Sequence, residues 1–527
     1  MQMHVVSANE WLYPDTAIPS SPKQRIDLLV ARGARCAAQV LLRPVPVGAK
    51  VTATFNGDLG AEVYQLIDVA VDHNTREFGF TVREGDEPAV HVTRQVPFRV
   101  YDALKPLRDG AETRAETEAL YVQWMMPRDA KPGRHAGTLN IAVGNESVAV
   151  PVTIDVATAT LPERETLRIV NWFNVGNMAS RHGIEPWSEE HWASIRRYGE
   201  LMRKIRQTDF IPSVGFEVIE NSDGTLSFDF SRGERLIKLY LGLGFRWING
   251  PHVATRVTFD APEFVLRNPR TQVKATGPEG YQFLAQYLSA WYQFLARNGW
   301  LDRVVQHVAD EPTEKCSEDY RVLSGIVRKF MPGVKIIDAL GLTELGGAVD
   351  VWVPLENKLN EELDGFVTHQ KLGDELWYYT CCIPGGKYLN RLLDMPLIRC
   401  RYLHWANQRY GLTGYLHWGL NQYRADQDPF EETARFHKEG GGTEWLPAGD
   451  THVVYPGPTE PWSSVRLEAE AMGAEDYELF RMIAAQDASK AEEIMVSVFR
   501  GFQDYSEDVA AFEVAHAALV NGAANAD

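Results

Sequence analysis

Two adjacent carboxylates, Asp310 and Glu311, stand between an apolar run and a proline in the stretch Val304-Val305-Gln306-His307-Val308-Ala309-Asp310-Glu311-Pro312. The apolar run predicts a buried strand, and the proline biases Glu311 toward an extended conformation. Two acids at the mouth of a buried strand lose hydration and repel each other, and catalysis is one reason to keep such a pair. The structural alternative is a helix cap, in which Asp310 or Thr313 begins a helix from about Glu314.

The spacing of the pair limits the chemistry it can perform. Retaining and inverting glycosidases use two carboxyls about 5–5.5 Å or about 6.5–9.5 Å apart, on opposite sides of the sugar. Neighbouring residues at one strand end act from one side, which is sufficient when a 2-acetamido oxygen of the substrate attacks the anomeric carbon. We therefore expect Glu311 to be the general acid/base, with a pKa raised by burial and by its charged neighbour. Asp310 is expected to stay ionised and to stabilise the oxazolinium-like intermediate.

The elements that must position this pair begin near Leu161, where short apolar segments alternate with longer helical patterns. This alternation predicts parallel strands with intervening helices. The predicted strands are 167–173, 210–213, 245–249, 304–310, 335–339, 349–355, 376–382 and 413–421, and helices are predicted over 188–206, 230–243, 280–298 and 312–330. Eight strands over roughly 260 residues match a (β/α)₈ TIM-like barrel. An open doubly wound sheet is the competitor, but no glycine-rich fingerprint follows the first strand.

Polar and aromatic residues recur at the end of these predicted strands, which is where barrel active sites lie. Each one alone is more often a packing or capping residue, but their recurrence at one end indicates a binding site. The candidate substrate-binding residues are Trp172, Asn174, His252, Trp352, Tyr379, Trp418 and Asn421. Of these, Trp418 as an aromatic wall and Tyr379 as a hydroxyl donor are expected to complete an acetamido pocket.

Two further regions flank the predicted catalytic barrel of residues 161–440. Residues 1–160 consist of short β-branched or aromatic segments separated by turn residues, which predicts an accessory β-sandwich with no chemistry of its own. Residues 441–527 predict a strand and helices packed on the barrel. In that region Arg466 with Glu468, and Glu475 with Asp476, are expected to form ion pairs that fix a helix under the barrel.

Composition narrows the classes of partner. A net charge of −18 argues against nucleic acid and anionic membranes. Fourteen Trp and twenty Tyr mildly favour sugar rings as ligands. The five cysteines have no metal-ligand spacing, and neither an HExxH pattern nor a Cys/His cluster occurs, so we expect no metal and no cofactor. No apolar run reaches about 18 residues, so no membrane span is expected.

The first residues contain no basic region followed by an apolar core, so a cytoplasmic location is expected unless a signal was trimmed. The sequence leaves the oligomeric state open.

Several motifs resemble glycoside hydrolase family 123 and its uncharacterised relatives, over roughly residues 95–485. They are Asp310-Glu311-Pro312, Tyr378-Tyr379-Thr380, Gly414-Tyr415-Leu416-His417-Trp418-Gly419-Leu420-Asn421, Tyr455-Pro456-Gly457, Ser464-Val465-Arg466-Leu467-Glu468 and Glu475-Asp476-Tyr477-Glu478. The resemblance implies a β-sandwich, a catalytic barrel and a small C-terminal region. It also implies exo-acting β-N-acetylgalactosaminidase activity by substrate assistance, with Asp310 orienting the acetamido group and Glu311 as its catalytic neighbour.

The sequence thus predicts a multidomain exo-glycosidase acting on terminal β-linked N-acetylhexosamine of a glycan or glycoconjugate, galacto before gluco. One alternative is a glycosidase of the same fold that acts on another sugar. The other is a carbohydrate-binding protein on a barrel without activity, in which Asp310 only caps a helix.

Overall fold

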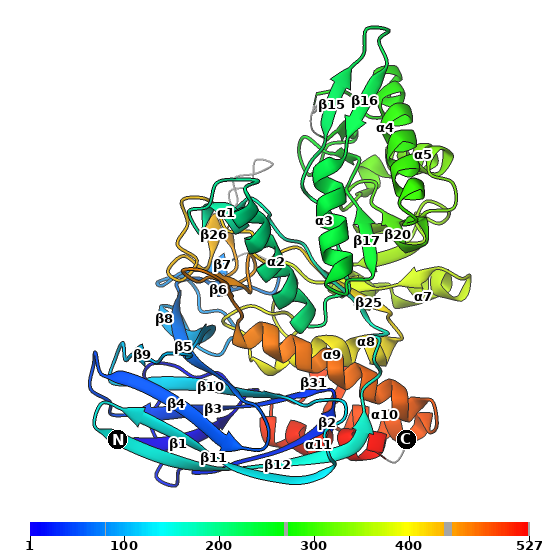
Figure 1. Ribbon diagram of the computed structural model, residues 1–527. Coiled ribbons are helices and arrows are strands. Elements are labelled where there is room, and N and C mark those ends of the chain that lie inside the picture. The colour runs from blue at the N-terminus through cyan, green and yellow to red at the C-terminus, as the bar shows by residue number, and fades with distance from the viewer. Residues whose placement is uncertain (79–80, 268–271, 437–444, 525–527) are drawn as a thin grey trace.

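The computed structural model describes residues 1–78, 81–267, 272–436 and 445–524. Figure 1 shows a β-rich layer built by the first 160 residues, the long helix α9 (Val465–Ala484) lying over it, and the parallel strands with their helices beyond α9. Both termini lie at the β-rich layer, where the last helices pack beside the first strands.

The first 160 residues form two five-stranded sheets around a common core. In order, one sheet contains β1 (Gln2–Ser7), β3 (Arg35–Arg43), β10 (Glu118–Met125), β5 (Glu62–Val71) and β8 (Phe98–Pro106), and the other contains β2 (Ile26–Arg32), β12 (Glu146–Thr160), β11 (Gly133–Val143), β4 (Lys50–Gly57) and β9 (Ala111–Glu112). Alternate residues of β11 and β12, such as Leu139 and Val150, are paired and buried. They pack in one cluster with Trp124 of the facing sheet, as inner faces of a sandwich do.

Residues 168–417 contribute two sheets in which every pairing is parallel. The six-stranded sheet has the order β14 (Asp209–Phe210), β17 (Trp247–Gly250), β20 (Val304–Gln306), β21 (Lys335–Leu340), β22 (Val351–Pro354) and β23 (Glu375–Leu376), and the three-stranded sheet has the order β13 (Arg168–Asn171), β25 (Gly414–His417) and β24 (Tyr378–Tyr379). Each of the eight predicted strand segments overlaps these strands. The apolar side chains of Val170, Val305, Ile337, Val353 and Leu416 meet in one interior cluster.

The predicted (β/α)₈ barrel is found only in part. The strands form two arcs, and β13 and β14 share the hydrogen bond from the Thr208 amide to the Ile169 carbonyl (3.1 Å) without a continuous ladder. The connection from β21 to β22, residues 341–350, contains no helix. This connection is shorter than the dozen or so residues that a helical crossover usually needs, and it contains Gly341, Gly346 and Gly347.

Helices cover the outside of the parallel strands. They are α1 (Asn177–Ser180), α2 (Glu189–Lys204), α3 (Ser231–Gly242), α4 (Pro278–Arg297), α5 (Ser317–Phe330), α6 (Glu356–Glu361), α7 (Leu363–Lys371) and α8 (Ile398–Tyr410). The local sequence sets their ends. The Ser188 hydroxyl accepts from the His191 amide at the start of α2 (3.1 Å), Pro278 occupies the first turn of α4, and Gly411 ends α8 with φ +65°.

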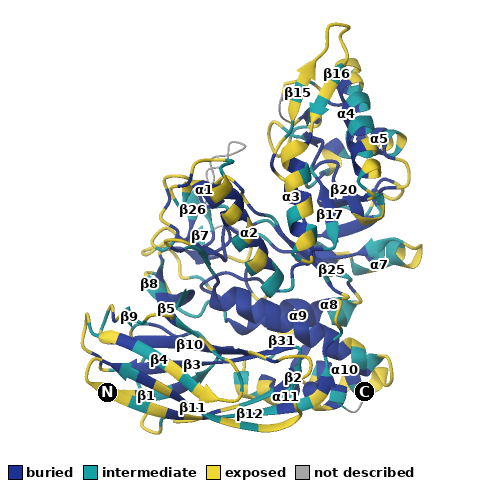
Figure 2. Ribbon diagram, viewed as in Figure 1, coloured by how far each residue is buried: buried dark blue, intermediate teal, exposed yellow. Residues whose placement is uncertain are grey.

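Helix α9 is buried along nearly its whole length, as its dark blue ribbon in Figure 2 shows. Ser464 caps it by accepting from the Leu467 amide (3.2 Å). One of its faces packs on the first sheet through Val465 and Met472, and another packs on β13 through Ala474. The helix therefore joins the β-rich layer to the parallel strands. The helices α10 (Ala488–Val498) and α11 (Val509–Ala524) pack beside it.

Four buried charges of α9 pair with other elements. The Arg466 guanidinium binds Asp102 of β8 (2.9 Å), and Asp476 binds Arg401 of α8 (2.7 Å). Glu468 and Glu475 both bind Arg35 of β3, at 2.8 and 2.9 Å. Each of the four residues forms an ion pair, but the expected pairs of Arg466 with Glu468 and of Glu475 with Asp476 do not form, because the partners lie in the sandwich and in α8.

Short elements complete the chain: β6 (Asn74–Thr75), β7 (Thr81–Val82), β15 (Glu217–Glu220), β16 (Leu226–Asp229), β18 (Ala254–Thr255), β19 (Val265–Leu266), η1 (Leu301–Arg303), η2 (Glu314–Cys316), β26 (Arg435–Phe436), β27 (Trp445–Leu446), β28 (Tyr455–Pro456), β29 (Pro461–Trp462), β30 (Phe499–Gly501) and β31 (Asp504–Tyr505). Of the helices in the described ranges, none is both long and apolar enough to cross a bilayer.

Candidate active site

The acidic pair lies just beyond β20, at the carboxyl end of the parallel strands. Glu311 has φ +46°, so its backbone is left-handed and not extended as its place before Pro312 predicts. Its amide donates to the Ala339 carbonyl of β21 (3.0 Å), and the Tyr379 hydroxyl donates to its Oε1. These contacts hold Glu311 in a conformation that costs about 1–3 kcal/mol, a strain typical of functional sites.

Thr313, and not Asp310, caps the helix that follows. Its side chain accepts from the Cys316 backbone, and its own amide donates to Cys316 Sγ (3.2 Å) at the start of η2. The Asp310 side chain is 49% exposed and lines a pocket. The capping alternative therefore does not explain Asp310, whose carboxyl group is available to a ligand.

The pocket above the acidic pair has a volume of about 1050 Å³. Five of the residues predicted from the sequence line it: Trp172 beyond β13, Asp310 and Glu311 beyond β20, Tyr379 on β24, and Trp418 beyond β25. Residues distant in the chain thus converge where parallel strands end, the usual position of active sites on such sheets.

Tyr379 and Trp418 are held in fixed orientations within the pocket. Burial and the charge of Glu311 raise the pKa of Tyr379 well above its usual value, so its hydroxyl keeps its proton and donates to Glu311. The Trp418 indole donates to Asp450 Oδ1 (3.0 Å). Burial raises the pKa of Asp450 to about 7.

A buried carboxylate, Asp338 of β21, supports the segment that leads to the pair. It accepts hydrogen bonds from His307 Nδ1 (2.8 Å), the amides of Val308 (2.9 Å) and Ala309 (3.2 Å), and the Tyr320 hydroxyl (2.6 Å). Because three consecutive residues before Asp310 bind one carboxylate, their backbone is fixed relative to β21. Asp338 therefore positions the acidic pair.

His252 lies beneath Asp310. Its Nε2 is 4.0 Å from Asp310 Oδ1 and 3.6 Å from Asp338 Oδ1, and burial lowers its pKa well below the usual value, so the ring is neutral. Although about half of the Asp310 side chain (49%) is open to the pocket, the protein around its carboxyl group and the charges of Glu311 and Asp338 raise its pKa above the usual value. This differs from the expectation that Asp310 stays ionised, because its nearest charged neighbours include two other carboxylates.

His252, His307 and Asp338 bring potential metal-ligand atoms within 4.8 Å of one another. Asp338 already accepts four hydrogen bonds, and His307 Nδ1 donates one of them, so this donor set fits a hydrogen-bond network and not a cation.

The remaining predicted residues lie outside the pocket, and their substrate-binding assignment needs correction. Trp352 is fully buried, stacks on His369 at 4.0 Å and donates to Asp374 (2.9 Å). Its neighbours on β22, Val351 and Val353, face the interior cluster, so strand alternation turns Trp352 outward to α7.

Asn174 and Asn421 bind each other and not the pocket. The Asn174 amide donates to Asn421 Oδ1 (2.7 Å), and Asn421 Nδ2 donates to the Asn174 carbonyl (3.1 Å). This pair joins the loops after β13 and β25. His252 supports the acidic pair from below and does not line the pocket.

Sequence reasoning missed His307, Asp450, Phe78 and Trp445, the last two of which line the pocket. His307 is a polar residue inside an apolar run, which is a usable signal. Asp450 and Trp445 lie outside the predicted strands, and Phe78 lies in the region predicted to be an accessory β-sandwich, so only the tertiary structure brings the three residues to the site.

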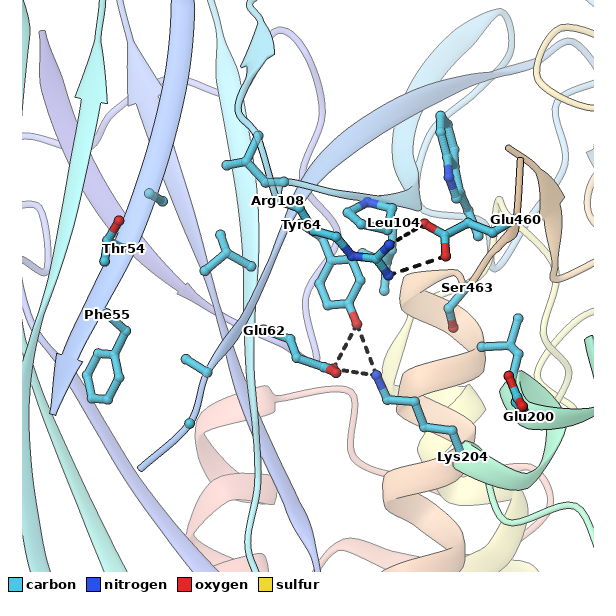
Figure 3. Close-up of a pocket in the computed structure, with 18 of the residues that line it drawn as sticks. Thr54, Phe55, Glu62, Tyr64, Leu104, Arg108, Glu200, Lys204, Glu460 and Ser463 are labelled. Carbon is cyan, nitrogen blue, oxygen red and sulfur yellow. Dashed lines mark hydrogen bonds and ion pairs between the residues drawn. The ribbon is translucent and has the colours of Figure 1, made fainter. Parts of the chain in front are cut away.

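A second groove, of about 820 Å³, lies between the β-rich layer and α2, and Figure 3 shows its charged side chains. The Tyr64 hydroxyl donates to Glu62 (2.8 Å) and accepts from Lys204 (3.0 Å), Lys204 also binds Glu62, and Arg108 binds Glu460 (3.1 Å). These charges neutralise one another and neither acid of the pair lines the groove. We therefore place the active site in the first pocket.

The family model for the catalytic domain of glycoside hydrolase 123 matches residues 172–483. A solved family 123 glycoside hydrolase from Clostridium perfringens, described for glycolipid glycan hydrolysis, superposes on this chain with a TM-score of 0.76 at 15% sequence identity. The match covers 99% of this chain and 98% of the Clostridium perfringens chain. That likeness shows the shared fold. No curated protein sequence matches the chain.

Two further solved structures are only remotely similar. A GH10 xylanase with an Ig-like domain from termite gut has a TM-score of 0.33 at 9% identity, over 86% of this chain and 100% of its own. A β-glucuronidase from Parabacteroides merdae has a TM-score of 0.34 at 11% identity, over 84% of this chain and 50% of its own.

Proposed function

This chain belongs to glycoside hydrolase family 123 and is a glycoside hydrolase, and on that premise we propose that it removes terminal β-linked N-acetylhexosamine by a substrate-assisted retaining mechanism. N-acetylgalactosamine is the favoured sugar. The relative from Clostridium perfringens acts on glycolipid glycans, and a glycoconjugate terminus of that kind is the substrate class we propose to assay.

The observation that carries the proposal is the adjacency of the two carboxyls in one pocket. Ordinary retaining and inverting enzymes place their carboxyls on opposite sides of the sugar, about 5–5.5 Å or about 6.5–9.5 Å apart. Asp310 and Glu311 are consecutive residues at one strand end. The other acids that line this pocket in the described residues, Asp260 and Glu314, are exposed, and Asp260 faces Lys315 (3.6 Å). A nucleophile supplied by the substrate resolves this one-sided arrangement.

In the proposed mechanism Glu311 protonates the leaving oxygen while the 2-acetamido oxygen attacks the anomeric carbon. The Tyr379 hydroxyl, which donates to Glu311, sets the direction of its carboxyl group. Asp310 in its ionised form accepts a hydrogen bond from the acetamido N–H and stabilises the positive charge of the oxazolinium-like intermediate. Water then opens that intermediate with Glu311 as the base.

Trp418 forms an apolar wall beside the acetamido methyl in this proposal. Its indole is fixed by Asp450 and its ring lines the pocket. Trp172 lies in the same pocket, and its ring contacts those of His252 and His307 at 5.3 and 5.8 Å, so it too has a fixed orientation.

The test is the release of nitrophenol from β-N-acetylgalactosaminide, β-N-acetylglucosaminide and plain β-galactoside by the wild type and Asp310→Asn. We expect the wild type to hydrolyse only the two acetamido sugars, the β-N-acetylgalactosaminide faster than the β-N-acetylglucosaminide. Asp310→Asn should lose that activity. Activity on the plain galactoside that survives the substitution would exclude substrate assistance. If none of the three substrates is hydrolysed, the proposed specificity for N-acetylhexosamine is wrong, whereas the family assignment still holds.

A further inference from the structure

An arm of the β-rich region reaches the catalytic pocket. We define the arm as residues 72–78 and 81–83, between the end of β5 and the long return to β8; residues 79–80 lie outside the described residues and are not part of the arm. Its strands β6 and β7 pair in antiparallel fashion. In Figure 1 they lie beside β26, away from the two five-stranded sheets. A domain expected to be purely accessory thus extends to the site of chemistry.

The arm is fixed to the loop that follows β24. Asp394 of that loop accepts from the Thr75 amide (2.6 Å), the Thr75 hydroxyl (2.9 Å) and Asn74 Nδ2 (3.2 Å), and all three residues are buried. Farther along, the Gly385 amide donates to the Glu77 carbonyl (2.6 Å), and a Cβ at Gly385 would collide with the Arg76 carbonyl. The same loop supplies Ile383 to the pocket wall, so the arm and the wall form one packed unit.

The arm contributes to the pocket in two ways. Phe78, at its tip, lines the pocket with 54% of its surface exposed. At its base, His73 stacks on Trp445 with ring centroids 4.4 Å apart and planes 23° apart, and the Arg83 guanidinium lies 4.5 Å from the centre of the same ring. Arg83 Nε also donates to His73 Nε2 (2.7 Å). Trp445 is therefore held in the pocket wall by side chains of the arm.

Four apolar residues that line the pocket belong to the arm or to segments in contact with it, and we call them the wall near the arm: Phe78, Ile383, Trp445 and Leu446. Elsewhere the pocket is lined by further apolar residues, such as Phe259 and Leu342, and by charged ones, such as Lys315 and Lys358. Phe78 is 54% exposed and Phe259 is 58% exposed, and the Phe259 ring lies 4.6 Å from the Arg256 guanidinium. Exposed apolar side chains gathered at the rim of a pocket mark a binding surface.

We propose that the arm, with Trp445, forms a leaving-group subsite for an apolar aglycone, such as an alkyl or acyl chain. The inference rests on the proposed function, because the group bonded to the oxygen that Glu311 protonates must extend from the acidic pair along the wall of this same pocket. Aliphatic and Phe side chains offer contact to hydrocarbon and no hydrogen bonds to hydroxyl groups, so the wall matches hydrocarbon better than a second sugar. The N-terminal domain thereby takes part in substrate selection.

The test compares methyl and octyl β-N-acetylgalactosaminides by the sugar released, for the wild type, Phe78→Ser and Val322→Ser. The two alkoxides are similar leaving groups, so a difference in kcat/KM reports binding of the chain. We expect the wild type to prefer the octyl glycoside, and Phe78→Ser to lower that preference by about tenfold through KM. Val322→Ser removes an apolar side chain of matched exposure (52%) on α5 and should leave the preference unchanged.

The outcomes separate the subsite from the proposed function. Turnover of the methyl glycoside tests the reaction, whereas equal use of both glycosides, or a preference that Phe78→Ser leaves intact, overturns the subsite. A sugar leaving group preferred over octyl overturns its apolar character. If neither glycoside is hydrolysed, calorimetric titration with octyl β-glucoside below its micelle concentration still tests the subsite. The wild type should bind it more tightly than Phe78→Ser does, and no binding overturns the proposal.

Discussion

Glu311 occupies a strained backbone position in contact with a tyrosine that keeps its proton, and this geometry suits proton transfer to a leaving group. We predict that Glu311→Gln lowers kcat/KM on alkyl N-acetylhexosaminides by about 10²–10⁴-fold, the usual contribution of general acid–base catalysis. The loss of bond-breaking rate should be much smaller for nitrophenyl substrates, whose leaving group needs little protonation. Steady-state kinetics across leaving groups of graded pKa measure this, and equal losses for all of them would contradict the role of Glu311 as the acid.

Asp310 should set the acidic limb of the pH profile. Its pKa is raised by burial and by Glu311 and Asp338, and the proposed mechanism uses its ionised form. Activity should therefore fall with falling pH well above the value near 4 at which an ordinary aspartate titrates. Asp310→Asn should abolish this limb in the residual activity, and a limb near 4 in the wild type would contradict the assignment.

The same raised pKa makes a prediction for stability. The folded protein binds the Asp310 proton more tightly than the unfolded chain does, so the contribution of this group is fully present at low pH and is lost as pH rises through the raised pKa. Asp310→Asn, which stays neutral, should therefore raise the unfolding temperature at neutral pH. The gain should vanish in acid. Asp260→Asn, an exposed acid at the same pocket, serves as the control, and an equal gain in both variants would contradict the prediction.

At the scale of elements, α9 depends on buried ion pairs with the sandwich. Arg35 binds both Glu468 and Glu475 with its side chain fully buried. Arg35→Met would leave two carboxylates buried without their cation, and removing one partner of a buried pair costs about 3–5 kcal/mol. Urea unfolding should show a loss of this order.

The matched control for that loss is Arg134→Met, on the same sandwich. Arg134 pairs with Asp155, but the two side chains are 73% and 45% exposed. Exposed pairs contribute about 0–1 kcal/mol, so this variant should unfold almost as the wild type does. If the two variants lose similar free energies of unfolding, the buried ion pairs of α9 stabilise the protein no more than an exposed pair does.

The strand pattern could be predicted from the sequence because apolar β-branched runs bounded by turn residues report local structure. The face of the sheet to which a given strand residue points could not be predicted from the sequence. Trp352 lies within a predicted strand just as Tyr379 does, yet alternation along β22 turns it outward to α7. The missing helix between β21 and β22 and the left-handed backbone of Glu311 likewise depend on contacts made between strands.

At the scale of the whole molecule, the acidic pair stands in one stretch of the sequence, whereas part of the pocket that surrounds it comes from distant parts of the chain. Phe78 and Trp445 are separated by most of the chain, and only the packing of the arm on the loop after β24 brings both to the site. A residue that acts through such long-range packing leaves no local pattern. The sequence interpretation therefore did not place any residue of the N-terminal region at the pocket.

This packing predicts that the fragment of residues 161–527 does not form an active enzyme by itself. Its α9 would expose Val465, Ala469 and Met472, which the intact chain packs against Leu41 and Tyr121. It would also lack Arg35 and Asp102, the partners of three buried charges of α9. We expect the expressed fragment to aggregate or to lose its near-ultraviolet circular dichroism and its turnover. A soluble, cooperatively folding and active fragment would instead mean that α9 needs no sandwich. Because α9 packs against the sandwich on one face and against β13 on another, contacts with both layers stabilise it, and removing the sandwich should destabilise the parallel strands as well.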